Sequence, residues 1–459
     1  MIKELMTTHR AYYNSGVTRQ LPVRLNALRR FGKELALMEE EILKALVDDF
    51  GKPNFEAYLS EFATATLELN HTIKHLEEWA KPEEIQRSVG TMMSKAIIQK
   101  EPLGVILVIS PFNYPVLLTL APIIAAVAAG NTAIVKMSSL APHTSAALDK
   151  LIRRSFRPGH VSIIAGAEGI NQAILEERYD KIMFTGSSQT GKEIMAKAAQ
   201  TLTPVLLELA GRNPAIILRD ADVFVAAKKI AWGKFINAGQ SCIAPDHVYV
   251  HREVKTAFLE ELKLWIYRFY GEDPAKSDSF GRIASLSKVQ SIHQKMTSDL
   301  NIVAGGVVDE TNLYIAPTVV TDVPLDHPLM QGEIFGPILP VNEYSDINEV
   351  ISSIRQQEKP LAAYVFGQDL DFALSVLERI PAGGGGINET MLQAASATLP
   401  FGGVGNSGMG SYHGKYGFDA FSHTRSTVIA SPNITLPFIY PPYDEYKIRL
   451  VKAFLKKLI

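Results

Sequence analysis

Two side chains in this sequence could carry covalent and acid–base chemistry. Cys242, in the stretch NAGQSCIAP, is the only cysteine among 459 residues. A thiolate is a nucleophile, but it needs a lowered pKa or a partner base, and most free cysteines are simply small buried hydrophobic residues. Glu208 lies inside the apolar stretch PVLLELA. A carboxyl group buried there has a raised pKa and could act as a general base, with a hydrogen-bonded structural glutamate as the alternative.

Two glycine-rich stretches approach nucleotide-binding patterns without satisfying them. GSSQTGKE, residues 186–193, has the spacing of a P-loop, but Glu193 stands where a Ser or Thr would hold magnesium. This excludes an NTPase, whereas the strand–glycine–helix context still predicts phosphate at a helix N-terminus, with a plain turn as the alternative. GVGNSG, residues 403–408, neither follows a strand nor opens a helix. We interpret it as a loop where backbones approach closely.

Composition excludes several classes of protein. A single cysteine excludes an intramolecular disulfide framework and a cysteine-rich zinc site, and we expect no metal. With a net charge of -2, the chain lacks the excess of basic residues that is typical of nucleic-acid-binding proteins. The uncharged stretch 103–135 is interrupted by prolines and glycines, which predicts a buried strand, a turn and a helix rather than a membrane span. With a polar N-terminus, the sequence predicts a soluble, cytoplasmic protein.

The elements that must position these residues follow a regular order. Residues 20–80 have the apolar spacing of helices. From Val105 onward, strands and helices alternate, which predicts a mostly parallel sheet with ligands at the carboxyl ends of its strands. A helix before the cysteine leads into a second α/β region. The stretch 383–417 is dense in glycine, but its interleaved Phe401, Met409 and Tyr412 indicate an ordered loop near a site.

Six motifs in this order resemble the NAD(P)-dependent aldehyde dehydrogenases, and in particular their class 3-like branch. They are ISPFNYP (109–115), IMFTGSSQTGK (182–192), LELAGRNP (207–214), FINAGQSCIAP (235–245), GEIFGPILP (332–340) and LPFGGVGNSGMGSYHGKYGFDAFSH (399–423). The resemblance spans nearly the whole chain. It implies oxidation of aldehydes to carboxylic acids with NAD or NADP, through a thiohemiacetal and a thioester on cysteine.

The resemblance also implies a role for each matching residue. Cys242 matches the nucleophile, Glu208 the general base, and Asn113 a side-chain donor to the oxyanion, with the Cys242 backbone N–H as the second donor. The implied cofactor-binding residues are Lys136, Ser139, Gly186, Ser187, Gly191, Glu333 and Phe335. The implied substrate-lining residues are Tyr114, Asn388 and Phe401. Plain loop packing is the alternative for Asn388 and Phe401, and a solvated strand-end lysine for Lys136.

The same resemblance divides the chain into three parts. Residues 1–82 and 102–208 would form a Rossmann-like cofactor domain, and residues 209–400 an α/β catalytic domain. Residues 83–101 and 422–440 would form a small β oligomerisation element. A homodimer is implied, with the C-terminal strand joining the sheet of the partner.

The sequence departs from the family pattern near the ribose. The usual K-P-S-E segment reads KMSS, so Ser139 replaces the acid that would repel a 2'-phosphate. We therefore expect NADP to be accepted or preferred. Tyr114, Met391 and Leu392 indicate an apolar tunnel for medium-chain or aromatic aldehydes, while Gln393, where relatives often carry His, leaves the substrate open. The alternatives are a CoA-acylating relative, against which Glu208 argues, and a catalytically retired structural member.

Overall fold

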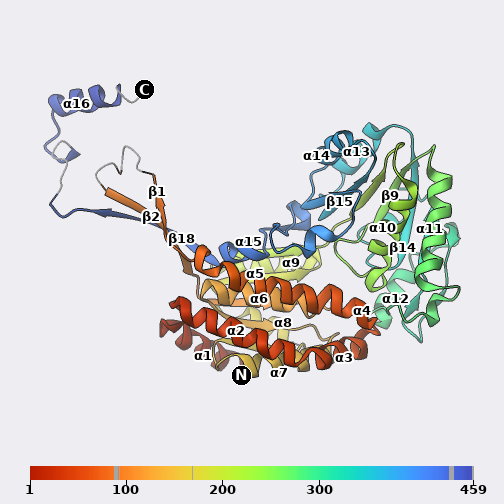
Figure 1. Ribbon diagram of the computed structural model, residues 1–459, viewed down its shortest axis with the longest axis horizontal. Helices are drawn as coiled ribbons and strands as arrows, with labels where there is room; N and C mark the ends of the chain where they lie inside the picture. The colour runs from red at the N-terminus through yellow and green to blue at the C-terminus, as the bar shows by residue number, and fades with distance from the viewer. Residues whose placement is uncertain (87–90, 92–93, 168, 434–438, 457–459) are drawn as a thin grey trace. The chain divides into compact units, whose positions relative to one another are not determined.

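The computed structural model describes residues 1–86, 91, 94–167, 169–433 and 439–456. Two compact units are present (Figure 1). The main unit comprises Met1–Trp79 and Pro102–His423, and the small unit comprises Ala80–Glu101 and Thr424–Ile459. Every candidate site residue belongs to the main unit.

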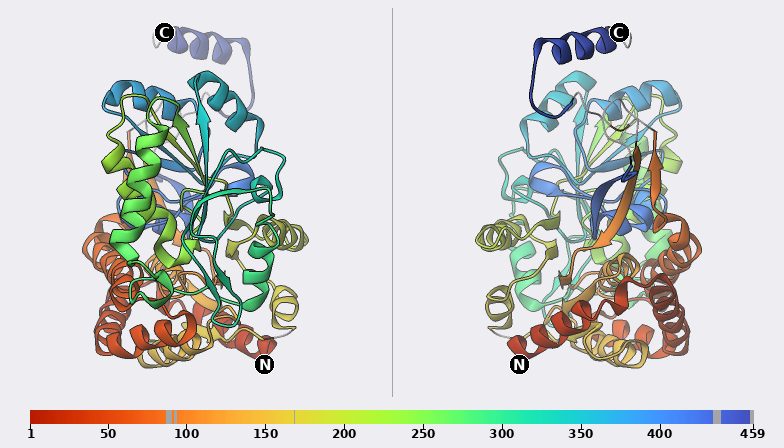
Figure 2. Two further views of the ribbon diagram at one scale, coloured as in Figure 1. Left: turned by 90° about the vertical axis from the view of Figure 1, so that its right-hand side faces the viewer. Right: turned by 90° about the vertical axis from the view of Figure 1, so that its left-hand side faces the viewer.

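Helices fill the start of the chain, and the apolar spacing predicts those between residues 20 and 80 but not the first helix. They are α1 (Ile2–Asn14), α2 (Leu21–Leu37), α3 (Glu39–Phe50), α4 (Asn54–Ala57) and α5 (Thr64–Trp79), with a π-helical turn at Tyr58–Ala63. Helix α3 buries Ile42 and Leu46 on one face and ends at Gly51. Helices α2 and α3 pack beside α7 (Pro142–Ser155) of the first sheet (Figures 1 and 2). The N-terminal helices therefore form a layer against that sheet.

The first sheet has six strands in the order β17-β7-β6-β3-β4-β5. Strands β3 to β7 run parallel, and β17 is antiparallel to β7. The strands are β3 (Val105–Ile109), β4 (Thr132–Lys136), β5 (Val161–Ile164), β6 (Lys181–Gly186), β7 (Val205–Leu209) and β17 (Gly408–Met409). The connecting helices are α6 (Leu117–Ala129), α7, α8 (Ile170–Leu175) and α9 (Ser188–Ala199). The predicted alternation of strand and helix is confirmed.

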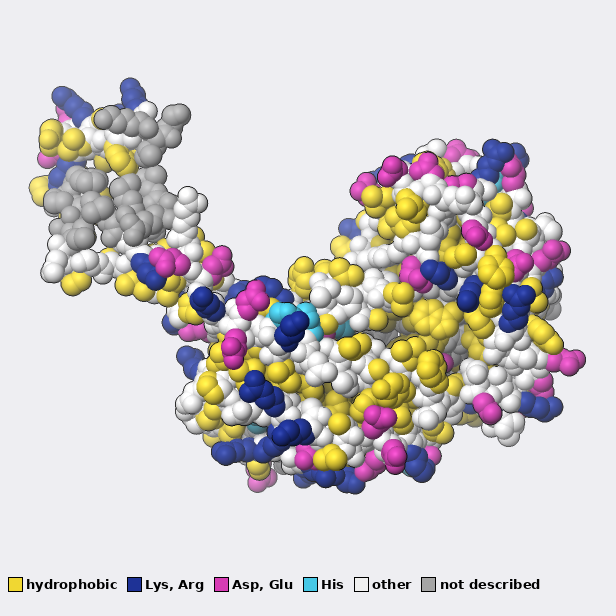
Figure 3. Space-filling view, viewed as in Figure 1, with side chains coloured by type: hydrophobic (Ala, Val, Ile, Leu, Met, Phe, Trp, Pro, Cys, Tyr) yellow, Lys and Arg dark blue, Asp and Glu magenta, His cyan; other side chains and the backbone are white. Residues whose placement is uncertain are grey.

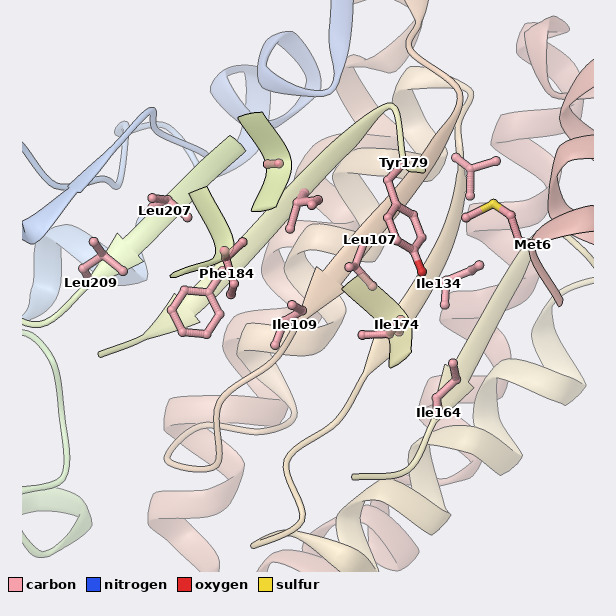
Figure 4. Close-up of a cluster of buried hydrophobic side chains, with 14 residues drawn as sticks. Met6, Leu107, Ile109, Ile134, Ile164, Ile174, Tyr179, Phe184, Leu207 and Leu209 are labelled. Atoms are coloured by element: carbon pink, nitrogen blue, oxygen red, sulfur yellow. The ribbon is translucent and has the colours of Figure 1, made fainter. Parts of the chain in front are cut away.

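A hydrophobic cluster holds one face of this sheet (Figure 4). Leu107 and Ile109 of β3 lie two residues apart and so point to the same face, as do Leu207 and Leu209 of β7. Met6 of α1 packs into the same cluster. Because burying one such side chain stabilises the fold by about 1.5–3 kcal/mol, the cluster fixes the strands at whose ends the site is built.

The second sheet has seven strands in the order β10-β13-β14-β9-β8-β15-β16. All neighbours are parallel except β10 and β13. The strands are β8 (Pro214–Ile217), β9 (His247–His251), β10 (Asn301–Ala304), β13 (Thr318–Thr321), β14 (Ile338–Tyr344), β15 (Ala362–Phe366) and β16 (Gly384–Ile387). The helices are α10 (Val223–Phe235), α11 (Lys255–Tyr270), α12 (Leu286–His293), α13 (Ile347–Gln356) and α14 (Leu370–Glu378). The hairpin β11–β12 (Val308–Asp309 and Tyr314–Ile315) stands apart from it. The chain thus passes from the first sheet to the second between Leu209 and Pro214.

The glycine-dense stretch is ordered, as expected. It contains β16, β17 and α15 (Gly414–Ala420), with short 3-10 turns between them. A Cβ on Gly403 would lie 2.0 Å from the Ser407 carbonyl oxygen, so the GVGNSG stretch is a close backbone approach rather than a dinucleotide turn. Through β17, this stretch returns to the first sheet.

The small unit contains a three-stranded sheet in the order β1-β2-β18 and one helix. Its elements are β1 (Glu83–Ile85), β2 (Ser94–Pro102), β18 (Ser422–Ala430) and α16 (Glu445–Leu455). Residues 87–90, 92–93 and 434–438 of the expected oligomerisation element lie outside the described residues. The division into cofactor domain, catalytic domain and oligomerisation element stays a prediction.

The described surface carries both signs of charge. Lys and Arg side chains alternate with Asp and Glu side chains over the face of the main unit in Figure 3. Among the described helices, none combines the length and apolarity needed to cross a bilayer. The uncharged stretch 103–135 folds as β3, α6 and β4, which are buried within the main unit.

Candidate active site

Cys242 lies in a turn between α10 and β9. Three consecutive residues before it, Asn237, Ala238 and Gly239, have positive φ angles of 53°, 49° and 76°. A Cβ on Gly239 would lie 2.3 Å from the Gly336 carbonyl group, so only glycine fits where this turn meets the loop after Glu333. Strained backbone of this kind persists only where the surrounding structure holds it. The cysteine is therefore presented by a rigid, densely packed turn.

Two residues that sequence reasoning missed hold this turn in place. Asn213 Nδ2 donates to the carbonyl oxygens of Cys242 (2.7 Å) and Ala244 (2.9 Å). Asp246 Oδ1 accepts from the Ile334 backbone N–H at 2.9 Å, which joins the cysteine turn to the loop 332–336. Asn213 lies inside a quoted motif and Asp246 directly follows one, but their partners are distant in sequence. Pattern alone could not reveal these contacts.

The charge around Asp246 is unusual for a buried group. Burial alone would raise its pKa, but a hydrogen bond from His247 and the charge of Lys234 outweigh burial and lower the pKa to about 2. The Asp246 carboxylate is thus ionised at neutral pH and remains an acceptor for the Ile334 N–H.

The thiol of Cys242 is not activated by its surroundings in this structure. Burial raises the pKa of the thiol, and the charges of Glu333 and Glu208 raise it further. The requirement for a lowered pKa is therefore not met by the chain alone. Two acids, rather than a histidine or a lysine, are the charged groups that dominate around the thiol. Both carboxyl groups thus interact electrostatically with Cys242.

Glu208 is a buried carboxyl group without a partner. It lies on β7, opposite Thr185 of β6 and Gly408 of β17, and is 2% exposed. Neither carboxyl oxygen has a hydrogen-bond partner among the described residues. Burial raises its pKa well above the usual range. The alternative of a hydrogen-bonded structural glutamate therefore does not describe this residue, and burial makes its carboxylate form a stronger proton acceptor than a solvated glutamate.

Asn113 and Tyr114 follow β3 and reach the cysteine turn. Asn113 Nδ2 donates to the Gln240 carbonyl oxygen at 3.1 Å, two residues before Cys242. The amide has a second N–H to offer to a ligand. Burial raises the pKa of Tyr114, and the charge of Glu56 raises it further. The charge of Cys242 acts in the same direction. Both residues are buried beside the thiol.

The residues expected at the diphosphate open helix α9. Gly186 ends β6, and Ser187 is the N-cap, with its Oγ accepting from Thr190 N at 3.2 Å. A Cβ on Gly191 would lie 2.6 Å from Leu209 Cδ2, so glycine allows α9 to pack on β7. The expected strand–turn–helix context is confirmed. Backbone N–H groups at such a helix start lack intrahelical acceptors and favour anions.

Lys136 and Ser139 lie at the end of β4. Lys136 Nζ donates to Asn171 Oδ1 at 2.7 Å, and the side chain is 8% exposed, so it is not a freely solvated lysine. Ser139 is exposed and lines a cavity of about 990 Å³. The two residues thus lie at the carboxyl edge of the first sheet, where nucleotides bind in such folds.

Glu333 and Phe335 lie on the loop that precedes β14. Phe335 has a positive φ of 46° and packs edge-on against Phe112, with ring centroids 5.9 Å apart. Burial, followed by the charge of Asp246, raises the pKa of Glu333 well above its usual range. The buried oxygen Glu333 Oε1 has no hydrogen-bond partner among the described residues.

These groups fit a dinucleotide. A hollow of about 840 Å³ is lined by Ser188 of α9, by Gly211 and by Glu333. Its wall thus combines N–H donors suited to a diphosphate with a buried carboxyl acceptor suited to ribose hydroxyl groups. Among the described residues, no group of three His, Cys, Asp or Glu side chains is arranged to hold a metal ion.

Two candidate lining residues have clear packing roles. Asn388 Nδ2 donates to the Gly367 carbonyl oxygen at 2.7 Å, and its Oδ1 accepts from Gly367 N at 2.9 Å. Phe401 pairs with Tyr412 through backbone hydrogen bonds and packs edge-on against its ring. Burial, then the charges of Glu208 and Cys242, raise the pKa of Tyr412. Tyr412, which the sequence indicated only as part of an ordered loop, thus interacts electrostatically with both Glu208 and Cys242.

Comparison with known proteins agrees with this geometry. The sequence pattern of the aldehyde dehydrogenase family matches residues 6–427. The chain is 41% identical over 458 residues to aldehyde dehydrogenase family 3 member H1 of Arabidopsis thaliana, covering 98% of this chain and 94% of the relative. It is 40% identical over 430 residues to "Aldehyde dehydrogenase, dimeric NADP-preferring" of Rattus norvegicus, covering 94% and 95%.

A solved structure shows the same fold throughout. The structure described as the substrate-bound state of Staphylococcus aureus AldH matches with a TM-score of 0.96 at 38% identity, covering 99% of each chain. The expected α/β architecture is confirmed by this match. The chain belongs to the aldehyde dehydrogenase family, the NAD(P)-dependent oxidoreductases that its six motifs indicated.

Proposed function

We propose that this protein oxidises medium-chain aliphatic or aromatic aldehydes to carboxylic acids, with Cys242 as nucleophile and Glu208 as general base. The observation that carries the assignment is the meeting of a sole thiol with a buried carboxyl group that has no partner of its own. An unpaired buried carboxyl destabilises a fold, so a functional use explains its presence. The buried rings of Tyr114, Phe401 and Tyr412 support an apolar substrate.

The side chains divide the reaction between them. Cys242 gives up its thiol proton to solvent and adds to the aldehyde carbon through its thiolate Sγ. The electrons of the C=O π bond pass to the oxygen, which becomes negative and accepts from Asn113 Nδ2 and the Cys242 N–H. When bound, the oxidised nicotinamide supplies a positive charge and a hydride acceptor. With the acyl group held on Sγ as a thioester, Glu208 takes a proton from the attacking water. The C–S bond then breaks, which releases the acid and restores the cysteine.

The cofactor assignment rests on residues at the ends of β4, β6 and the Glu333 loop. The start of α9 would hold the diphosphate, and Glu333 the nicotinamide ribose. Ser139 is exposed and uncharged, so a 2'-phosphate beside it meets no carboxylate at that position. We therefore extend the proposal to NADP as an accepted or preferred cofactor.

The proposal includes a cytoplasmic homodimer. Strand β18 stands at the end of its sheet order, and its side chains are mostly exposed. An exposed strand edge is a template for pairing with another chain. The pairing strand would be supplied by a second copy.

Steady-state kinetics test this function directly. Purified protein is mixed with hexanal or benzaldehyde and with NAD or NADP, and the absorbance of reduced cofactor is followed. We expect turnover that is abolished in Cys242→Ala and that needs no CoA. Turnover only with CoA would establish the acylating alternative, and no turnover under any condition would favour the retired enzyme. A kcat/KM at least about tenfold higher with NAD would overturn the NADP assignment.

A further inference from the structure

A buried lysine lies directly beneath the Asn113 loop. Lys52, between α3 and α4, has a side chain that is 1% exposed. Its Nζ donates to Glu61 Oε1 and, at 3.0 Å, to the backbone carbonyl oxygen of Asn113. The same Nζ lies 4.6 Å from the centre of the Tyr114 ring, within the range of a cation–π contact. One cation therefore holds two consecutive residues of the candidate site.

Glu61 holds the far end of the same loop. Its side chain is fully buried in the π-helical turn, and its Oε2 accepts from the Val116 backbone N–H at 2.7 Å. The Lys52–Glu61 pair thus fixes residues 113–116 from both ends. Taking two charges out of water is unfavourable, and a buried ion pair is weak evidence for stability. The hydrogen bonds to this particular loop suggest a use in positioning.

The loop is also joined to the cysteine turn. Asn237 Nδ2 donates to the Asn113 carbonyl oxygen at 2.9 Å and to the Gln240 carbonyl oxygen at 3.1 Å. Glu56 Oε1 in turn accepts from the Asn237 backbone N–H at 2.9 Å. The Asn113 carbonyl therefore has two donors, one from the lysine cluster and one from the turn that carries Cys242.

We propose that Lys52 is a positioning residue for catalysis: by holding the Asn113 backbone, it aims the Asn113 amide at the oxyanion formed beside Cys242. This inference rests on the proposed function. An oxyanion donor acts only when it is held in place before the reaction, and losing such a donor lowers kcat by about 10²–10³-fold. Lys52 touches no reacting atom, so its removal should misplace the donor rather than delete it.

The test uses a pair of substitutions that removes the buried charges together. Lys52→Met alone leaves Glu61 charged and unpaired, and could prevent folding. The double variant Lys52→Met/Glu61→Gln is uncharged, and its glutamine oxygen can still accept from Val116 N–H. We expect this variant to fold and to lower kcat by about 10–10²-fold, with KM changed less than about threefold.

A comparison with Asn113→Ala separates positioning from general damage. If Lys52 acts through Asn113, the Lys52→Met/Glu61→Gln pair lowers kcat by less than about twofold in the Asn113→Ala background. An equal loss of kcat in both backgrounds, or no loss in the otherwise native enzyme, would overturn the proposal. Turnover by the native enzyme is measured in the same series. Its absence would instead refute the proposed function.

A matched control removes a different ion pair in the main unit. Arg10 of α1 pairs with Asp180, directly before β6, and neither residue is among those assigned to the site. Arg10→Ala is expected to lower the melting temperature and to leave kcat and KM unchanged. A fall in kcat for this control equal to that of the Lys52 variant would mean that kcat merely follows stability.

Discussion

Two acidic side chains help to keep the Cys242 thiol protonated. Burial and the carboxyl groups of Glu333 and Glu208 keep the pKa of Cys242 raised in the cofactor-free chain. Oxidation of cysteine proceeds through the thiolate, so this arrangement also slows oxidation of Cys242. Activation then requires a change in the charges around Cys242, which fits a positively charged cofactor.

Alkylation of the free protein measures this effect. Because the thiolate is the reactive form and the pKa is raised, the rate of iodoacetamide addition should be low at neutral pH. It should increase about tenfold per pH unit as the pH rises. Glu333→Gln removes one of the two carboxyl groups that raise the pKa of the thiol and should speed the reaction about fivefold at fixed pH, which corresponds to about 1 kcal/mol. Mass spectrometry of the intact chain reports each adduct at Cys242, since no other cysteine exists.

The control for this experiment is Glu253→Gln, at an exposed carboxylate that pairs with Arg219. It should leave the alkylation rate unchanged. A rate that does not vary with pH in the native protein would show that the thiol is already ionised. It would contradict the raised pKa.

At the scale of elements, α4 carries a carboxyl group whose titration affects stability. Burial raises the pKa of Glu56 to about 7. The positive charge of Lys52 lowers this pKa, and the negative charge of Glu61 raises it. Glu56 in turn raises the pKa values of Tyr114 and Tyr270. The folded protein therefore binds a proton at Glu56 more tightly than the unfolded chain does.

The sign of the pH dependence follows from this shift. Between pH 4.5 and about 7 the folded state holds the Glu56 proton longer, so this group's contribution to stability falls as pH rises. Glu56→Gln removes the titrating carboxyl group and therefore removes this loss of stability at higher pH. We expect the melting temperature of Glu56→Gln, relative to the native protein, to be several degrees higher at pH 8 than at pH 5. An equal difference at both pH values would show that Glu56 does not titrate in this range.

The elements themselves were predictable, because each is encoded by nearby residues. The fully apolar run Val105–Ile109 and the N-cap Ser187 are local signals, and the structure has a strand and a helix start there. Cys242, Glu208 and Asn113 were found through motifs. Lys52 was not found in this way, because its role depends on contacts with Glu61 and the Asn113 carbonyl. Only the folded chain brings these groups together. The raised pKa of Cys242 was missed for the same reason, since Glu333 lies about ninety residues away.

At the scale of the whole molecule, the proposed dimer makes a separate prediction. Val428 and Ile429 of β18 are 57% and 50% exposed, which leaves apolar surface on an edge strand. Val428→Glu should shift the light-scattering mass from two chains toward one at micromolar concentration. Leu202→Glu, at a main-unit leucine that is 91% exposed, should leave the mass unchanged. A native protein with the mass of one chain would refute the homodimer.

The antiparallel pairing of β17 with β7 has a consequence for synthesis of the chain. Glu208 lies opposite Gly408, so two hundred residues separate strand β7, which carries Glu208, from strand β17, which pairs with it. On the ribosome, the other five strands of that sheet emerge long before β17. Until then β7 is an edge strand, and Glu208 lies at the open margin of the sheet. The sheet around Glu208 is therefore completed only after a segment two hundred residues downstream of Glu208 has been made.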